Sequence, residues 1–333
     1  MEVLKTIVPS SISTIFRRHR IKILIFLSSL PYIVLKAYFG GDFRIFLAGA
    51  EYLRDGISPY GFFMNYEGKP IDVFLYSPLF AYILIPFTYL PAFIPIFLFC
   101  VSNIFLLFRI WEILVEWIDI KSLSYSQYIW WSIVTILLTI RFILHNFEKT
   151  QMNILILYLS LEGLYQILLF AKARGAFLLA LGICLKVLPI VFLPYLIYKK
   201  KISVSGIIIL LCCFLLILPS FSFGFTFNLQ LIKGWLEAIN PILDKYNAEQ
   251  NTSVWFHCIS ALIPVYFTNT SYHGISVNVA NLSENEIFLL ITFFRATFII
   301  GTLWFLRIVS LAGKSRLFLF WELSYIFLII LLI

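Results

Sequence analysis

Long uninterrupted apolar runs constrain this chain more than any other feature of its sequence. Several approach the ~20 residues that a helix needs to cross a bilayer, in a chain that is 61% hydrophobic and only 13% charged. Strands of a membrane β-barrel alternate polar and apolar residues, and these runs do not. The sequence therefore predicts an all-α, polytopic integral membrane protein with about nine to ten transmembrane helices. The runs expected to provide the spans are 21–39, 76–89, 96–115, 128–144, 154–170, 175–198, 204–221, 287–306 and 317–333.

The net charge of +8 comes from basic residues grouped in short segments between these runs. Such grouping is typical of cytoplasmic loops and does not indicate nucleic-acid binding. Residues 17–22 place the N-terminus in the cytoplasm, and the three lysines at 199–201 mark another cytoplasmic loop. The predicted location is the cell membrane. Because the histidines and cysteines are not spaced as metal ligands, we expect no metal and no cofactor.

The longest polar interruption in the first half of the chain is 40–78, which holds five carboxylates and three bases. Gly40 and Gly41 end the first helix, and Asp42 stands where a helix N-cap belongs. An amphipathic helix follows, suited to the membrane interface. Two interpretations of Asp42 stay open and are compatible: a capping residue, or a catalytic carboxylate at the membrane surface. The apolar face of this helix is formed by Phe43, Phe46, Leu47, Ala50 and Leu53.

Lys186 interrupts the apolar run 175–198 about a dozen residues from either end, which is ~18 Å along a helix. An ionisable residue at that depth is a functional candidate by default, and the alternative is a snorkelling side chain. We expect two half-helices to meet between Lys186 and Pro189, so that the lysine reaches the outer face. Whether this segment is a re-entrant hairpin or one broken crossing stays open.

Three other features lie outside the spans. The joint 145–153 is unusually polar for its length. A second interfacial helix is predicted after Ser222, with its apolar face at Leu229, Ile232, Trp235, Leu236 and Ile239. The run 254–267 is ~14 residues, too short for a comfortable crossing, and is expected to be re-entrant or interfacial.

Several short motifs, in this order, resemble those of glycosyltransferase family 87, whose members include polyprenyl-phosphate-mannose-dependent α-1,2-mannosyltransferases of the GT-C class. The resemblance covers residues 42 to 253. Two departures stand out: Thr150 replaces the family's Gly, and further C-terminal spans are absent. The motifs are Asp42-Phe43, Ala48-Gly49-Ala50, Asp55-Gly56-x-x-Pro59-Tyr60, Tyr76-x-Pro78, Gln151-x-Asn153, Lys186-x-x-Pro189 and Asn251-x-Ser253.

The resemblance implies a single membrane-embedded GT-C-like domain over 1–333, with interfacial helices in its outer loops. It implies an inverting transfer of a hexose, with mannose favoured, from a polyprenyl-phosphate sugar donor to a lipid or glycan acceptor on the extracytoplasmic face. Asp42 would be the general base, and Lys186 would meet the charge of the departing phosphate. The other candidate substrate-binding residues are Arg44, Arg54, Tyr60, Gln151, Asn153 and Asn251.

Several of these assignments have alternatives. Gln151, Asn153 and Asn251 are equally well interpreted as polar residues at helix ends. Trp235 and Trp255 are better interpreted as interfacial anchors than as sugar platforms. A transporter or lipid flippase also uses broken helices with charge at the membrane midplane, but no internal repeat is visible in this sequence. A polysaccharide polymerase and a non-enzymatic scaffold are further alternatives.

Overall fold

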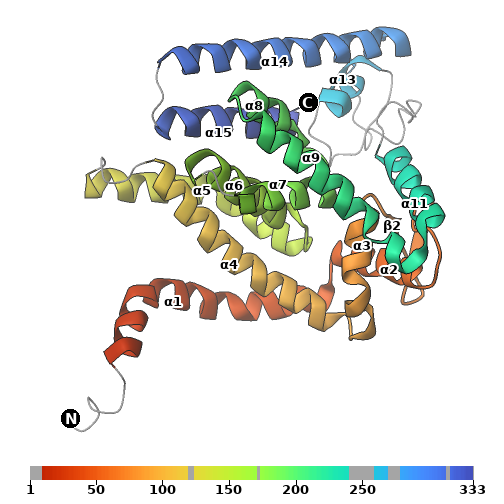
Figure 1. Cartoon of the computed structure of the whole chain (residues 1–333), viewed down its shortest axis with the longest axis horizontal. Helices are drawn as coiled ribbons and strands as arrows, with labels where there is room; N and C mark the ends of the chain where they lie inside the picture. Colours follow the sequence, from red (N-terminus) through yellow and green to blue (C-terminus); the bar gives the residue numbers. More distant parts are fainter. Residues whose placement is uncertain are drawn as a thin grey trace. The chain divides into compact units, whose positions relative to one another are not determined.

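The computed structural model describes residues 10–118, 124–170, 173–239, 259–268, 278–312 and 316–332 (Figure 1). Contacts divide the chain into two compact units, one made of 1–113 and 125–238 and the other of 114–124 and 239–333. The described residues are almost entirely helical, and six helices are long and apolar enough to cross a membrane. Four shorter apolar helices accompany them. The predicted all-α polytopic membrane fold is confirmed, whereas the single domain stays a prediction.

The first unit contains the helices that carry the candidate site residues. In chain order they are α1 (Ser10–Phe39), α2 (Phe43–Arg54), α3 (Pro78–Leu84), the 3-10 helix η2 (Ile85–Tyr89), α4 (Phe93–Trp117), α5 (Tyr125–Glu148), α6 (Asn153–Phe170) and α7 (Ala173–Leu185). They are followed by the 3-10 helix η4 (Leu188–Val191), α8 (Phe192–Tyr198), α9 (Ile202–Ile217), α10 (Ser220–Phe223) and α11 (Phe225–Ala238).

Successive long helices run antiparallel, so that four of their ends meet beside Asp42. The ring of Phe43 packs on Phe99 near the start of α4, with centroids 4.8 Å apart. Farther along α1, Phe26 packs on Phe105, with centroids 5.4 Å apart. The backbone N–H of Asp42 donates to the carbonyl of Lys149, just past the end of α5, across 2.7 Å. The end of α1, the start of α4, the end of α5 and the start of α6 therefore lie at one end of this unit.

This arrangement corrects the prediction that residues 76–89 cross the membrane. Tyr76 packs on Phe46 of α2, with ring centroids 4.6 Å apart, so the segment begins at the same end of the unit where α4 starts. Its two short helices, α3 and η2, cover ~18 Å, well short of the ~30 Å hydrocarbon core. Pro86 and the 3-10 turn interrupt the helix further. The segment returns to the end at which it began.

The predicted amphipathic helix after Asp42 is confirmed as α2, and its predicted apolar face is buried. The sequence did not reveal the hairpin that follows it, β1 (Phe63–Tyr66) paired antiparallel with β2 (Lys69–Val73). Glu67 and Gly68 form its turn with positive φ angles of 49° and 75°, as tight hairpins require. Met64 and Tyr66 are buried on the face of the hairpin opposite Phe63.

The second predicted amphipathic helix corresponds to α11, and the side that it buries includes only part of its predicted apolar face. Asn228, Leu231 and Trp235 are buried, whereas Leu229 and Leu236 are exposed. Asn228 is buried because its amide donates to the carbonyl of Leu216 at 2.9 Å and to Ser220 Oγ at 2.8 Å, which closes the turn from α9 into α11. The contact of the exposed leucines with the membrane interface stays a prediction.

Helices α6 and α7 form the tightest pair in this unit. A Cβ added at Gly175 would lie 2.6 Å from the carbonyl oxygen of Gly163, so neither position has space for a larger residue. Such small residues let membrane helices approach closely. The pair therefore packs as one body, which starts at Asn153 and ends beside Lys186.

The second unit consists of α13 (Ile259–Phe267), α14 (Glu284–Ala312) and α15 (Arg316–Leu332). Ile263 of α13 and Ile287 and Ile291 of α14 form its buried cluster. Phe305 and Tyr325 stack with ring centroids 4.2 Å apart and join α14 to α15. Helix α13 is short, as the sequence predicted for 254–267, of which residues 254–258 lie outside the described residues.

Candidate functional site

The site is built on a joint between two loops that are distant in sequence. The backbone of Asp42 is bonded to Lys149, and the hydroxyl of Thr150 donates to the carbonyl of Gly40 at 2.6 Å. The same hydroxyl accepts from the N–H of Phe43 at 3.2 Å, which satisfies a donor in the first turn of α2. A Cβ at Gly41 would lie 2.5 Å from the Lys149 carbonyl, so glycine is required where the loops touch.

Asp42 precedes α2, but its side chain does not cap that helix. No cap hydrogen bond is formed by its carboxylate; instead Oδ2 accepts from Nε2 of Gln151 at 3.1 Å. Thr150 supplies the hydrogen bond that a capping residue ordinarily would. The carboxylate therefore lies at the start of α2 but accepts no hydrogen bond from that helix.

Three hydrogen bonds connect Asp42 to Lys186 through two amides. Gln151 donates to Asp42, Asn153 Nδ2 donates to Gln151 Oε1 at 2.8 Å, and Lys186 Nζ donates to Asn153 Oδ1 at 3.0 Å. An ammonium can only donate and an ionised carboxylate can only accept. The two charged ends therefore orient both amides. We refer to Asp42, Gln151, Asn153 and Lys186 as the polar row.

The structure explains why Thr150 can stand where a glycine was expected from the resemblance. Its φ is 49°, in the left-handed region that favours glycine. A β-branched residue is strained there, and the hydrogen bonds of its hydroxyl to Gly40 and Phe43 offset that strain. This conformation turns the chain from α5 into α6 and brings Gln151 to Asp42.

Lys186 lies at a break between helices, as the sequence predicted. Helix α7 ends at Leu185 and η4 begins at Leu188, with Pro189 inside the 3-10 turn. The ammonium of Lys186 meets the first residue of α6. The break therefore brings the lysine to the end of the unit where Asp42 lies.

Two further groups lie beside Asp42. Arg44 lies over the Gly40 turn and donates through Nη2 to the carbonyl of Tyr38 at 3.4 Å; its buried Nε has no partner among the described residues. Burial raises the pKa of Tyr76, and the charge of Asp42 raises it further. Tyr76 thus keeps its phenol proton beside the carboxylate. Tyr76 belongs to one of the sequence motifs, but the sequence assigns it no role, because its proximity to Asp42 arises only from tertiary contact.

The structure does not bring the other predicted residues into the row. Arg54 donates to Asp55 at 3.0 Å and to Thr88 at 2.9 Å and lies over the ring of Tyr89. The hydroxyl of Tyr60 donates to the carbonyl of Tyr76 at 2.8 Å, and its ring packs against Gly234. Both residues hold elements around the site together. Asn251 and Trp255 lie outside the described residues.

Comparison with known proteins gives one match. The sequence model of glycosyltransferase family 87 matches residues 74–333, a stretch that includes Gln151, Asn153 and Lys186. Asp42, Arg44, Arg54 and Tyr60 precede the matched stretch. No curated protein and no solved structure matches the chain. Since the matched stretch exceeds half of the sequence, the chain belongs to glycosyltransferase family 87.

Proposed function

We propose that this membrane glycosyltransferase transfers a hexose, with mannose favoured, from a polyprenyl-phosphate sugar to a lipid or glycan acceptor. The observation that carries the proposal is the polar row, in which a carboxylate and an ammonium are held apart by two amides. Glycosyl transfer from a phosphate donor uses these groups: a base for the acceptor, a cation for the leaving group, and neutral hydrogen-bonding groups for the sugar between them.

Asp42 would act as the general base. A sugar hydroxyl is a weak nucleophile, so a positioned carboxylate takes its proton as the acceptor oxygen attacks the anomeric carbon. The proton passes to Asp42, a new C–O bond forms, and the bond from the anomeric carbon to the phosphate oxygen breaks. Attack opposite the leaving group inverts the anomeric centre.

Lys186 would stabilise the departing polyprenyl phosphate, whose negative charge grows as the bond breaks. Arg44, with its unpartnered Nε, is the second cation for that phosphate. Gln151 and Asn153 would exchange the hydrogen bond between them for hydrogen bonds to sugar hydroxyls. The positive charges make a divalent metal unnecessary for this leaving group.

Charge distribution supports an extracytoplasmic site. Helix α1 carries Arg20 and Lys22 in its first half and ends beside Asp42, ~25–30 Å farther along the helix. Basic residues that flank spans favour the cytoplasmic side, so the opposite end of α1 faces outward.

The test is direct. The purified full chain, reconstituted in vesicles, is given a radiolabelled polyprenyl-phosphate mannose and a crude glycolipid acceptor fraction. We expect labelled glycolipid together with free polyprenyl phosphate, and an anomeric configuration in the product opposite to that of the donor. Polyprenyl-phosphate glucose is the matched alternative donor. Absence of transfer from either donor, with a correctly folded chain, would overturn the proposal.

A further inference from the structure

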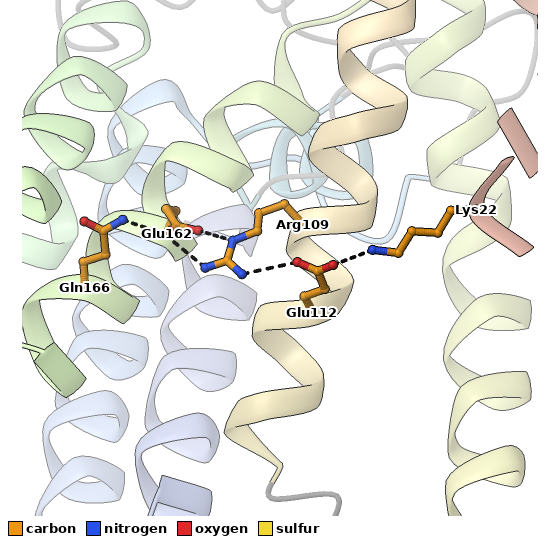
Figure 2. A network of polar contacts seen from close by, with 5 residues as sticks. All are labelled: Lys22, Arg109, Glu112, Glu162 and Gln166. Carbon is orange, nitrogen blue, oxygen red and sulfur yellow. Dashed lines mark hydrogen bonds and ion pairs between the residues drawn. The ribbon is translucent and has the colours of Figure 1, made fainter. Parts of the chain in front are cut away.

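A second polar network joins α1, α4 and α6 away from the polar row (Figure 2). Arg109 of α4 donates to Glu162 of α6 through Nε at 2.7 Å and Nη2 at 3.3 Å. Its Nη1 donates to Glu112 at 3.3 Å, and Glu112 also accepts from Lys22 of α1. Gln166 completes the network by donating to Glu162 at 2.6 Å.

The network lies inside helices expected to cross the membrane. Glu162 is only 4% exposed and follows Asn153 by nine positions, ~14 Å along α6. Burying an isolated carboxylate there would be very costly. The four charges alternate in sign from Lys22 to Glu162 and sum to zero, and Glu162 is the one of the four that is buried. Ionisable residues in a membrane helix are functional candidates by default.

This network gives α1 and α6 a second connection. At one level they meet through the joint of Gly40 and Asp42 with Thr150 and Gln151. At the other level Lys22 reaches Glu162 through Glu112 and Arg109. One connection fixes a single point of contact, whereas a second one at another level also restrains the angle between the two helices.

The second connection also reaches Lys186. Glu162 is adjacent to Gly163, which contacts Gly175 of α7 too closely for any side chain. Helix α7 ends directly before Lys186. Any rotation of α6 would therefore carry α7 with it and move the lysine relative to Asp42, which follows α1.

We infer that Arg109 and Glu162 are positioning residues, whose ion pair sets the distance between Asp42 and Lys186. The effect of the ion pair on the distance between Asp42 and Lys186 does not depend on the proposed function. Its effect on turnover rests on that function. The two are separated by measuring geometry and activity on the same variants.

Geometry is measured by electron paramagnetic resonance between spin labels at Tyr38 and Leu188, which are 73% and 42% exposed. They mark the end of α1 and the turn after Lys186, in a full-length chain whose native cysteines are replaced by alanine. We expect one narrow distance in the parent. Arg109→Gln leaves the buried Glu162 without its ion-pair partner, and Glu162→Gln leaves Arg109 with Glu112 alone; either change should broaden or shift the distance. The double variant Arg109→Gln/Glu162→Gln removes both charges and leaves two amides that can pair, so it should restore the distance measured in the parent.

Activity separates positioning from general damage. Each single variant should lower kcat about 10- to 100-fold, since small misplacements of reacting groups have effects of that size, with the KM for donor within about twofold. Arg141→Gln, an exposed arginine of α5 outside the network, is the matched control and should change neither distance nor kcat.

If the single variants do not fold, Arg109→Lys replaces them in the experiment, because it keeps the charge but loses the bidentate contact with Glu162. It should still broaden the distance distribution between the spin labels. Unchanged distances in the single variants, or in Arg109→Lys, would overturn the inference. So would a double variant as disturbed as the singles. Altered distances in a chain that shows no transfer would refute the proposed function alone.

Discussion

The amide of Gln151 donates to the carboxylate of Asp42 across 3.1 Å, although the two residues are 109 positions apart. This contact joins the end of α1 to the start of α6. It also leaves the carboxylate unused by the helix that it precedes. A carboxylate that is held in place but does not cap a helix can still accept a proton, as a general base must.

Asp42→Asn should abolish turnover while the protein keeps its fold. Loss of a general base lowers rate by about 10²- to 10⁴-fold, and no helix cap is lost because Thr150 supplies it. Sugar transfer and thermal unfolding are measured on the same preparation. Asp55→Asn, at the end of α2 and paired with Arg54, is the control and should retain transfer. Full turnover by Asp42→Asn would remove this residue from the mechanism.

Lys186→Met should insert normally but bind the donor weakly. Methionine retains the length of the apolar stem and loses the charge expected to meet the phosphate. Donor affinity is measured by titration with polyprenyl-phosphate mannose in detergent. Lys233→Met, on the exposed side of α11 and paired with Glu237, is the matched control. An unchanged affinity in Lys186→Met would assign the phosphate contact to another cation, with Arg44 the first to examine.

Thr150→Val should lower the unfolding temperature more than Thr150→Gly. Valine keeps the strained positive φ and leaves the Gly40 carbonyl and the Phe43 N–H without their partner, a loss of about 1–3 kcal/mol per buried group. Glycine loses the same hydrogen bonds but relieves the strain. Thermal unfolding of both variants tests this order. The reverse order would mean that the backbone at this position is not strained.

Gly41→Ala should separate the two loops of the joint and strongly reduce transfer. Its Cβ would lie 2.5 Å from the carbonyl of Lys149, where backbone cannot move aside cheaply. Gly56→Ala is a close control, because that glycine also has a positive φ but has no atom within 4 Å of its Cβ position. Transfer assays should show a large loss for the first variant and a small one for the second. Equal effects would attribute the loss to backbone strain alone.

The sequence by itself determined the class of fold, because long apolar runs have few solutions in a bilayer. It also determined the start of α2 and the break at Lys186, since glycine, proline and a buried charge act locally. The burial of Asn228 in α11 could not be predicted, because its hydrogen-bond partners come from α9 and α10. Nor could the return of residues 76–89, which depends on where α2 and α4 pack.

Only the tertiary structure decided which polar residues meet. Asp42, Gln151 and Lys186 were each visible as polar residues in an apolar chain, but nothing local orders them into one row. Arg109 and Glu162, 53 positions apart, lie in separate apolar runs, and nothing in the sequence pairs them. The cost of leaving a charge unpaired in an apolar interior is what brings such residues together, and the partner is chosen by helix packing, which the sequence does not display.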